Sequence, residues 1–388
     1  MNDKAPSRKD VEEKRRETTM FLDALTPCLF LTLLLLVLGC SHRPPADFAP
    51  DPGLVQRITQ IRIDAPSAAC PGQSFPASYT AVLSDGSLVP FENRYDKDHP
   101  PRLHVVFLDR ISNAATPLEN GAWTADRDPL LTVTTGFHLT VVLRQKASLQ
   151  ATATLAPEYS CLPHAFGFQG APGDRGGAGG DGPDVTVRLG IVRSPYVERL
   201  LIAGIEIGYA PPFYTVADAN VVPPRDWLLI ESRGGQGGRG RNGSPGTKGQ
   251  DAPSPEPCPG SNGGPGSPGG RGADGGPGGR GGRITIIVPT EVPFLAGLVD
   301  AHTPGGPGGD GGAGGDGGAG GRRGTTTNCD RPGVNGVAGE KGASGGRGGD
   351  GPYGLRPQVI TVSARDVFGT RIPPGLADLL GESAPRRP

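Results

Sequence analysis

Glycine at every third residue constrains this chain more than any other feature. The period runs through five stretches, residues 167–184, 234–251, 260–283, 305–322 and 333–356. Three residues per turn is the period of the left-handed polyproline II helix, so each glycine falls on the same edge. That helix has no internal hydrogen bonds, and its N–H and C=O groups need partners outside it. The bare glycine edge lets a second backbone come close enough to supply them.

Two ordered structures offer such partners, a collagen triple helix of three chains and a polyglycine II bundle of rods within one chain. Collagen depends on proline at the second and third triplet positions, which proline occupies only twice and six times in 34 triplets. Glycine takes the second position in 17 of the 34. In a bundle, that choice gives a rod a second bare edge. The counts favour the single-chain bundle, with the collagen-like homotrimer and a solvated, disordered linker as the alternatives.

The four later stretches form two copies of one unit: six triplets, an insert, eight triplets and a strand. Each unit predicts a hairpin of two rods, and six triplets at about 3.1 Å per residue make a rod roughly 55 Å long. Each insert carries one cysteine, Cys258 in the first and Cys329 in the second. If the hairpins lie side by side, these cysteines form a disulfide, which would stabilise by about 4 kcal/mol in the chain-entropy model. Free thiols and pairing between chains are the alternatives.

Residues 1–39 predict a targeting segment that is not part of the fold. Basic residues precede an apolar core at 28–38, which is short for a bilayer span of about 20 residues. The core ends in the motif VLGC at 37–40, which resembles the lipobox of bacterial lipoproteins. The resemblance implies cleavage after Gly39 and acylation of Cys40, so that lipid attaches the chain to a membrane. An uncleaved membrane anchor is the alternative.

Residues 40–51 form a proline-rich tether without apolar periodicity. Ser41 follows the acylated residue and replaces the aspartate that holds many such lipoproteins at the inner membrane. The resemblance to lipoproteins therefore implies an outer-membrane protein of the cell envelope.

Residues 52–162 predict an ordinary globular domain, a β-sandwich of several short strands with no helical period. The expected strands are RITQIRID, FPASYTAVL, LHVVFL, LLTV, HLTVVL and SLQATATL. Asp85-Gly86 predicts a hairpin turn. A strand, a Gly-Gln turn, an alternating strand and a D-G turn follow one another here, an order that resembles bacterial Ig-like domains. Cys70 and Cys161 lie near the two ends of the domain and predict a structural disulfide in an exported protein.

Residues 163–374 form a collagen-like, glycine-rich module with strands between the rods. The expected strands are DVTVRLGIV, RLLIAGIEIGY, WLLIES, RITIIVP, GLVDAH and QVITVSARDVF. These predict a small β base from which the rods project. Residues 375–388 predict a frayed tail. The fold class expected is all-β, without significant helix after the targeting segment.

Composition and motifs argue against nucleic acid, cofactors and catalysis. The net charge of −1 gives no electrostatic reason to expect nucleic acid as a partner. Acidic residues balance the arginines of the RGG sequences, so these charges are interpreted as solvated surface charges of the rods. Asp96, Asp98 and His99 are interpreted as a polar loop rather than a metal site. No catalytic residue, cofactor or metal ligand is predicted.

The combined expectation is a surface-anchored lipoprotein with a non-catalytic structural or adhesive role, binding an extracellular protein or polysaccharide. The tract GGAGGDGGAGG resembles tracts in glycine-rich mycobacterial surface proteins. The rods also resemble those of springtail antifreeze proteins, but their Arg, Asp, Glu and Lys side chains argue against ice binding. The alternatives are a collagen-like homotrimer serving as a spacer or ligand, and an enzyme with its site in the sandwich loops. A monomer is favoured over the trimer.

Overall fold

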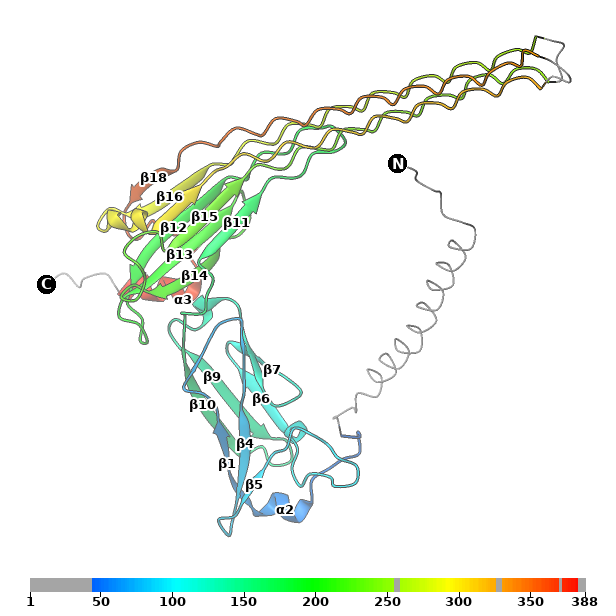
Figure 1. Cartoon of the computed structure of the whole chain (residues 1–388). Helices are drawn as coiled ribbons and strands as arrows, with labels where there is room; N and C mark the ends of the chain where they lie inside the picture. The colour runs from blue at the N-terminus through cyan, green and yellow to red at the C-terminus, as the bar shows by residue number, and fades with distance from the viewer. Residues whose placement is uncertain (1–43, 255–258, 326–329, 370–371, 383–388) are drawn as a thin grey trace, which may run out of the picture.

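The computed structural model describes residues 44–254, 259–325, 330–369 and 372–382. Within them the chain is predominantly β and has three parts (Figure 1). An N-terminal unit is followed by a base of two sheets. Three glycine-rich segments leave the base and three return to it, and four of these six segments are long and run side by side away from the base. We call these segments rods.

The N-terminal unit consists of three small sheets, ordered β1-β4-β5, β2-β10-β9-β6 and β3-β8-β7. Apolar side chains alternate inward along its longer strands, as in β9, where every second residue is buried. Tyr79 and Trp123 lie at the centre, where the Trp123 Nε1–H donates to the Tyr79 hydroxyl at 2.8 Å. Its elements are α2 (Pro52–Arg57), β1 (Ile58–Asp64), β2 (Ala68–Ala69), β3 (Ser74–Phe75), β4 (Ser78–Leu83), β5 (Leu88–Pro90), η1 (Val105–Phe107), β6 (Leu108–Ser112), β7 (Ala115–Pro117), β8 (Trp123–Ala125), η2 (Pro129–Leu131), β9 (Phe137–Leu143) and β10 (Gln150–Pro157).

Two segments expected to be strands differ from that expectation. LLTV forms η2 and a turn, because Asp128 accepts from the Leu130 N–H and Pro129 sits at the first helical position. LHVVFL forms η1 before β6 begins, and His104 caps this helix by accepting from the Val106 N–H. The hairpin expected at Asp85-Gly86 is present between β4 and β5.

The base packs two sheets face to face around one apolar core. One sheet is wholly parallel, in the order β11-β15-β17, and the other has the order β14-β13-β12-β16-β18. Their core includes Leu189, Ile230 and Ile286, all fully or almost fully buried. The elements are β11 (Ala165–Gln169), β12 (Val185–Val192), β13 (Leu200–Ile207), β14 (Phe213–Asp218), β15 (Leu228–Arg233), β16 (Ile284–Pro289), η3 (Pro293–Leu298), β17 (Val299–His302) and β18 (Gln358–Val362).

Each rod continues a strand of the base. The rods leave β11, β15 and β17 and return into β12, β16 and β18, so the pattern of strand, two rods and strand occurs three times. The sequence predicted the second and third copies. The stretch at 167–184, expected as one rod, instead begins in β11 and reverses near Gly176, whose φ of 72° suits a turn. The rods, numbered 1 to 6, are residues 170–174, 177–184, 234–252, 260–283, 304–324 and 333–356.

The C-terminal segment expected to fray forms helix α3 (Pro374–Glu382) instead. Its Leu376 and Leu379 are buried in a cluster that also holds Leu130 and Val133 of the N-terminal unit. The same cluster contains Leu200, Ile202 and Val216 from the outer face of the larger base sheet. The helix therefore helps to join the N-terminal unit to the base through a shared apolar core.

Candidate functional site

The rods lie in two layers and hold one another through backbone hydrogen bonds. Rods 1, 3 and 5 run outward from the base in one layer, and rods 2, 4 and 6 run back in the other. Within a layer neighbours are parallel, as where the N–H groups of Gly234 and Gly237 donate to Pro304 and Pro307 at 3.0 and 2.9 Å. This pairing continues the register of the parallel base strands without a break. The base thus sets the alignment of the rods.

Between the layers, the hydrogen bonds form chains that cross the whole bundle. One chain passes from rod 6 to rod 1 with N–H to oxygen distances of 2.6 to 2.9 Å at every step. Its members, each donating to the next, are Gly348, Gly309, Gly276, Gly238, Gly177 and Asp174. A parallel chain lies one triplet away, from Gly351 to Ala171. Such chains pair the backbone amides of the rods, and the hydrogen bonds along one chain polarise one another cooperatively.

In rods 3 and 5, second-position glycines lie where another rod passes alongside. A Cβ added to Gly235 or Gly238 of rod 3 would collide with carbonyl oxygens of rod 1. Rod 1 turns back after residue 174, and the next second position of rod 3 is Arg241. Every second position of rod 5, which touches three other rods, is glycine. In these two rods the choice between glycine and a side chain therefore follows the presence of a neighbouring rod.

Aspartate and asparagine at third triplet positions hold neighbouring rods together. Their side-chain oxygens accept backbone N–H groups of the next rod at 2.7 to 3.0 Å. The residues are Asp181, Asn242, Asp251, Asn262, Asp274, Asn335 and Asp350. The rod aspartates were expected to be solvated charges, and this role was not predicted because the partner of each is known only once the rods are aligned. Lys248 and the Arg322 N–H hold the pKa of Asp251 below its ordinary value.

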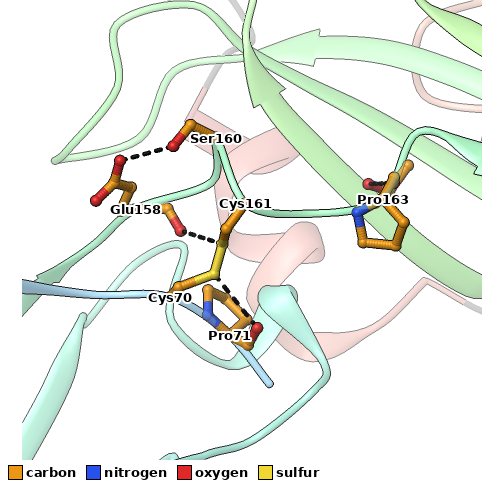
Figure 2. The surroundings of a disulfide bond; sticks show 7 residues. Cys70, Pro71, Glu158, Ser160, Cys161 and Pro163 are labelled. Carbon is orange, nitrogen blue, oxygen red and sulfur yellow. Dashed lines mark hydrogen bonds between the residues drawn. A yellow bond between two sulfur atoms is a disulfide. The ribbon is translucent and has the colours of Figure 1, made fainter. Parts of the chain in front are cut away.

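The cysteines predicted as sites have different outcomes. Cys70 and Cys161 form the expected disulfide, which spans 91 residues, as Figure 2 shows. Beside it the Ser160 hydroxyl donates to Glu158 at 2.6 Å (Figure 2). Cys40, the predicted lipid attachment site, lies outside the described residues, as do Cys258 and Cys329.

The described residues on either side of the two insert cysteines lie close together. In the first part of the two inserts, a hydrogen bond joins the hydroxyls of Ser254 and Thr325. Past the two cysteines, the Gly260 N–H donates to the Arg331 carbonyl at 3.1 Å. The two hairpins therefore point the same way and end side by side, which is the arrangement that a bridge between their inserts requires.

A cleft of about 990 Å³ lies where the N-terminal unit meets the base, and we call it the joint cleft. Aromatic and proline side chains dominate its walls. They include Pro71 and Cys161 beside the disulfide and Phe213 and Tyr214 on β14. Burial raises the pKa of the Tyr214 hydroxyl. The cleft has an apolar surface, but no arrangement of a nucleophile with a base is evident in it.

A second hollow of about 660 Å³ lies in the N-terminal unit, and we call it the arginine pocket. The sequence analysis missed it, because its residues are far apart in the chain and belong to no motif. Burial and the nearby Arg110 charge lower the pKa of His104, which is 4% exposed. Its lining residues are Pro44, Asn93, Arg94, His104, Val105, Val106, Leu108, Arg110, Glu119, Asn120 and Arg144.

The described residues contain neither a metal-ligand cluster nor a membrane-spanning helix. Asp96, Asp98 and His99 lie in an exposed loop, with His99 Nδ1 3.8 Å from an Asp96 oxygen. In the described part of the chain, no three His, Cys, Asp or Glu side chains gather as metal ligands. No helix within the same residues has the length and apolar character to cross a membrane.

Comparisons with known proteins give no relative. The chain matches no protein-family profile, no curated protein and no solved structure.

Proposed function

We propose that this chain is a lipid-anchored protein of the cell envelope whose glycine rods form a stiff, non-catalytic arm with a structural or adhesive role. The observation that carries the proposal is the hydrogen-bond lattice of the rods. Chains of backbone N–H···O=C hydrogen bonds cross up to six segments of one molecule, as from Gly348 to Asp174. A structure held this way projects far from its base without an ordinary apolar core.

Within this proposal the rods adopt the polyglycine II arrangement, and the N-terminal unit is an Ig-like β-sandwich. Support for the first comes from the period of three and from hydrogen bonds between parallel and antiparallel neighbours at every triplet. Support for the second comes from small sheets around a shared core, in which every strand pair except the parallel β2–β10 pair is antiparallel. A monomer is the expected state, because glycine edges that a collagen-like trimer would need already face rods of the same chain.

The lipid anchor is proposed from the sequence motif at residues 37–40. Acylation of Cys40 would hold the N-terminal unit at the membrane and leave the rods free to extend outward, with the outer membrane as the expected location. An extracellular protein or a polysaccharide is the expected partner class. A Cys258–Cys329 bridge at the far end is part of the same proposal, supported by the adjacent hairpin ends.

Shortening the arm without breaking its lattice tests the proposed role. Deleting residues 243–248, 266–271, 314–319 and 339–344 removes two matched triplets from each of rods 3 to 6. The remaining hydrogen-bond partners stay in register, and the arm becomes about 19 Å shorter at about 3.1 Å per residue. We expect a folded monomer whose maximum dimension, measured by small-angle X-ray scattering, falls by that amount.

The functional readout is binding of cells displaying the chain to arrays of matrix proteins and polysaccharides. We expect cells with the full arm to bind one polymer class and cells with the shortened arm to bind it less. The matched control deletes only residues 243–248, which shifts rod 3 against its neighbours and should disorder the bundle. Turnover of a polymer by the purified chain, or equal binding at both arm lengths, would contradict the proposed role.

A further inference from the structure

The arginine pocket contains two buried hydrogen-bond donors for which the described residues supply no acceptor. The Nδ1 atom of His104 accepts from the Val106 N–H at 3.1 Å, so the ring proton is carried by Nε2. That Nε2 is buried and lacks a partner among the described residues. Arg110 donates through Nη2 to the Leu118 carbonyl at 2.7 Å, but its buried Nη1 likewise has no partner there. Leaving a buried donor unpaired destabilises the fold, and more so when the donor is charged.

The charges around these two donors favour an acceptor that carries negative charge. Arg94, Arg110 and Arg144 line the pocket with His104, against the single carboxylate of Glu119. Asp109 lies 2.7 Å from Arg144 and offsets part of that charge. Phosphate oxygens suit such a site, because arginine offers several N–H donors in a fixed fork. An ordered water is the uncharged alternative occupant.

The position of the pocket identifies the source of the phosphate. Pro44 belongs to the pocket wall, and only three residues separate it from Cys40. A fully extended chain advances at most about 3.6 Å per residue, so the two Cα atoms lie within about 14 Å of each other. If Cys40 carries the lipid, the pocket lies at the height of the membrane headgroups. This step rests on the lipid anchor of the proposed function.

We propose that the arginine pocket binds the phosphate of an anionic phospholipid headgroup in the membrane that anchors the chain. The His104 Nε2–H and the Arg110 guanidinium donate to phosphate oxygens, and Arg94 lies exposed at the rim. The contact fixes the orientation of the N-terminal unit on the bilayer. Because the base is joined to that unit by a shared core, it also fixes the direction of the rods.

Calorimetric titration of the full processed chain in non-ionic detergent tests the proposal. The probes are short-chain phosphatidylglycerol, short-chain phosphatidylcholine and inorganic phosphate. We expect phosphatidylglycerol to bind more tightly than the other two. Arg110→Gln should weaken that binding roughly tenfold to a hundredfold, the usual range for a lost hydrogen bond to a charged group. Arg94→Gln should weaken it less, and Arg62→Gln, an exposed β1 residue outside the pocket, should leave it unchanged.

The contrary outcomes are distinct. Equal affinity for phosphatidylglycerol and inorganic phosphate would overturn the membrane source. No binding of any anion by the wild-type chain would mean that the pocket holds an ordered water only. If Arg110→Gln fails to fold, Arg94→Gln still tests the proposal, because Arg94 is exposed and its replacement leaves the fold intact. Unchanged phosphatidylglycerol binding by Arg94→Gln would then count against the pocket. Mass spectrometry of Cys40 tests the anchor separately, so a missing acyl group is not confused with an empty pocket.

Discussion

Gly348 and Gly349 are adjacent in rod 6, yet they meet different surroundings. A Cβ on Gly348 would collide with the backbone of Gly276 in rod 4, whereas no atom lies within 4 Å of a Cβ built on Gly349. At the residue scale, a facing backbone requires glycine at position 348 but not at position 349. The expectation that a second-position glycine serves a second neighbour holds at Gly235 and Gly238 but fails at Gly349.

We expect Gly348→Ala to destabilise the bundle by about 1–3 kcal/mol, the usual cost of overpacking. Gly349→Ala is the matched control and should be neutral or stabilising by about 0.5 kcal/mol, because alanine lowers the entropy of the unfolded chain. Native-state hydrogen exchange of the rod amides gives both free energies. Equal effects of the two substitutions would refute the proposed packing of rod 6.

Asp274 illustrates a residue role that the sequence alone concealed. Its carboxylate accepts the Gly346 N–H at 2.7 Å, from a residue 72 positions away. Nothing local distinguishes it from a solvated charge, since the partner is known only once rods 4 and 6 are aligned. The nearby Arg271, 3.3 Å away, adds a surface ion pair of small energetic weight.

We expect Asp274→Ala to cost about 1 kcal/mol, because the Gly346 N–H loses its acceptor. Asp274→Asn keeps an acceptor oxygen and should retain most of that stability. Amide exchange at Gly346 is the direct readout and should accelerate in the alanine variant. If asparagine behaves like alanine, the ion pair with Arg271 and not the backbone contact would account for the effect.

At the scale of elements, the disulfide and α3 secure the connection between the N-terminal unit and the base. Cys161 follows β10 and precedes the chain's entry into β11, so the bridge to Cys70 fastens the end of the unit that faces the base. The strands with clear alternation were predicted correctly, whereas α3 was missed. Its signal was present, because Leu376, Leu379 and Leu380 have helical spacing.

Replacing Cys70 and Cys161 with serine should lower the unfolding free energy of the N-terminal unit by about 4–5 kcal/mol for a loop of this length. Trp123 is fully buried in that unit and reports its unfolding by fluorescence. Trp227→Phe in the background makes Trp123 the sole tryptophan. A loss below about 1 kcal/mol would mean that the bridge contributes little to this unit.

At the scale of the molecule, a short apolar base supports a long polar bundle. Each strand of the smaller base sheet, β11, β15 and β17, continues into an outgoing rod. Each returning rod continues into β12, β16 or β18 of the larger sheet, so the sheets set the register of the rods. The N-terminal unit shares an apolar core with the base, so packed side chains and not only a linker join the two.

The central claim is that the backbone N–H groups of the rods donate to carbonyls of neighbouring rods in the same molecule. Hydrogen–deuterium exchange of the glycine amides, measured on a preparation shown by analytical ultracentrifugation to be monomeric, tests this most directly. We predict slow exchange at Gly238, Gly276, Gly309 and Gly348, which share one hydrogen-bond chain. Exchange at unprotected peptide rates in a clean monomer, or protection that appears only on trimerisation, would contradict the account.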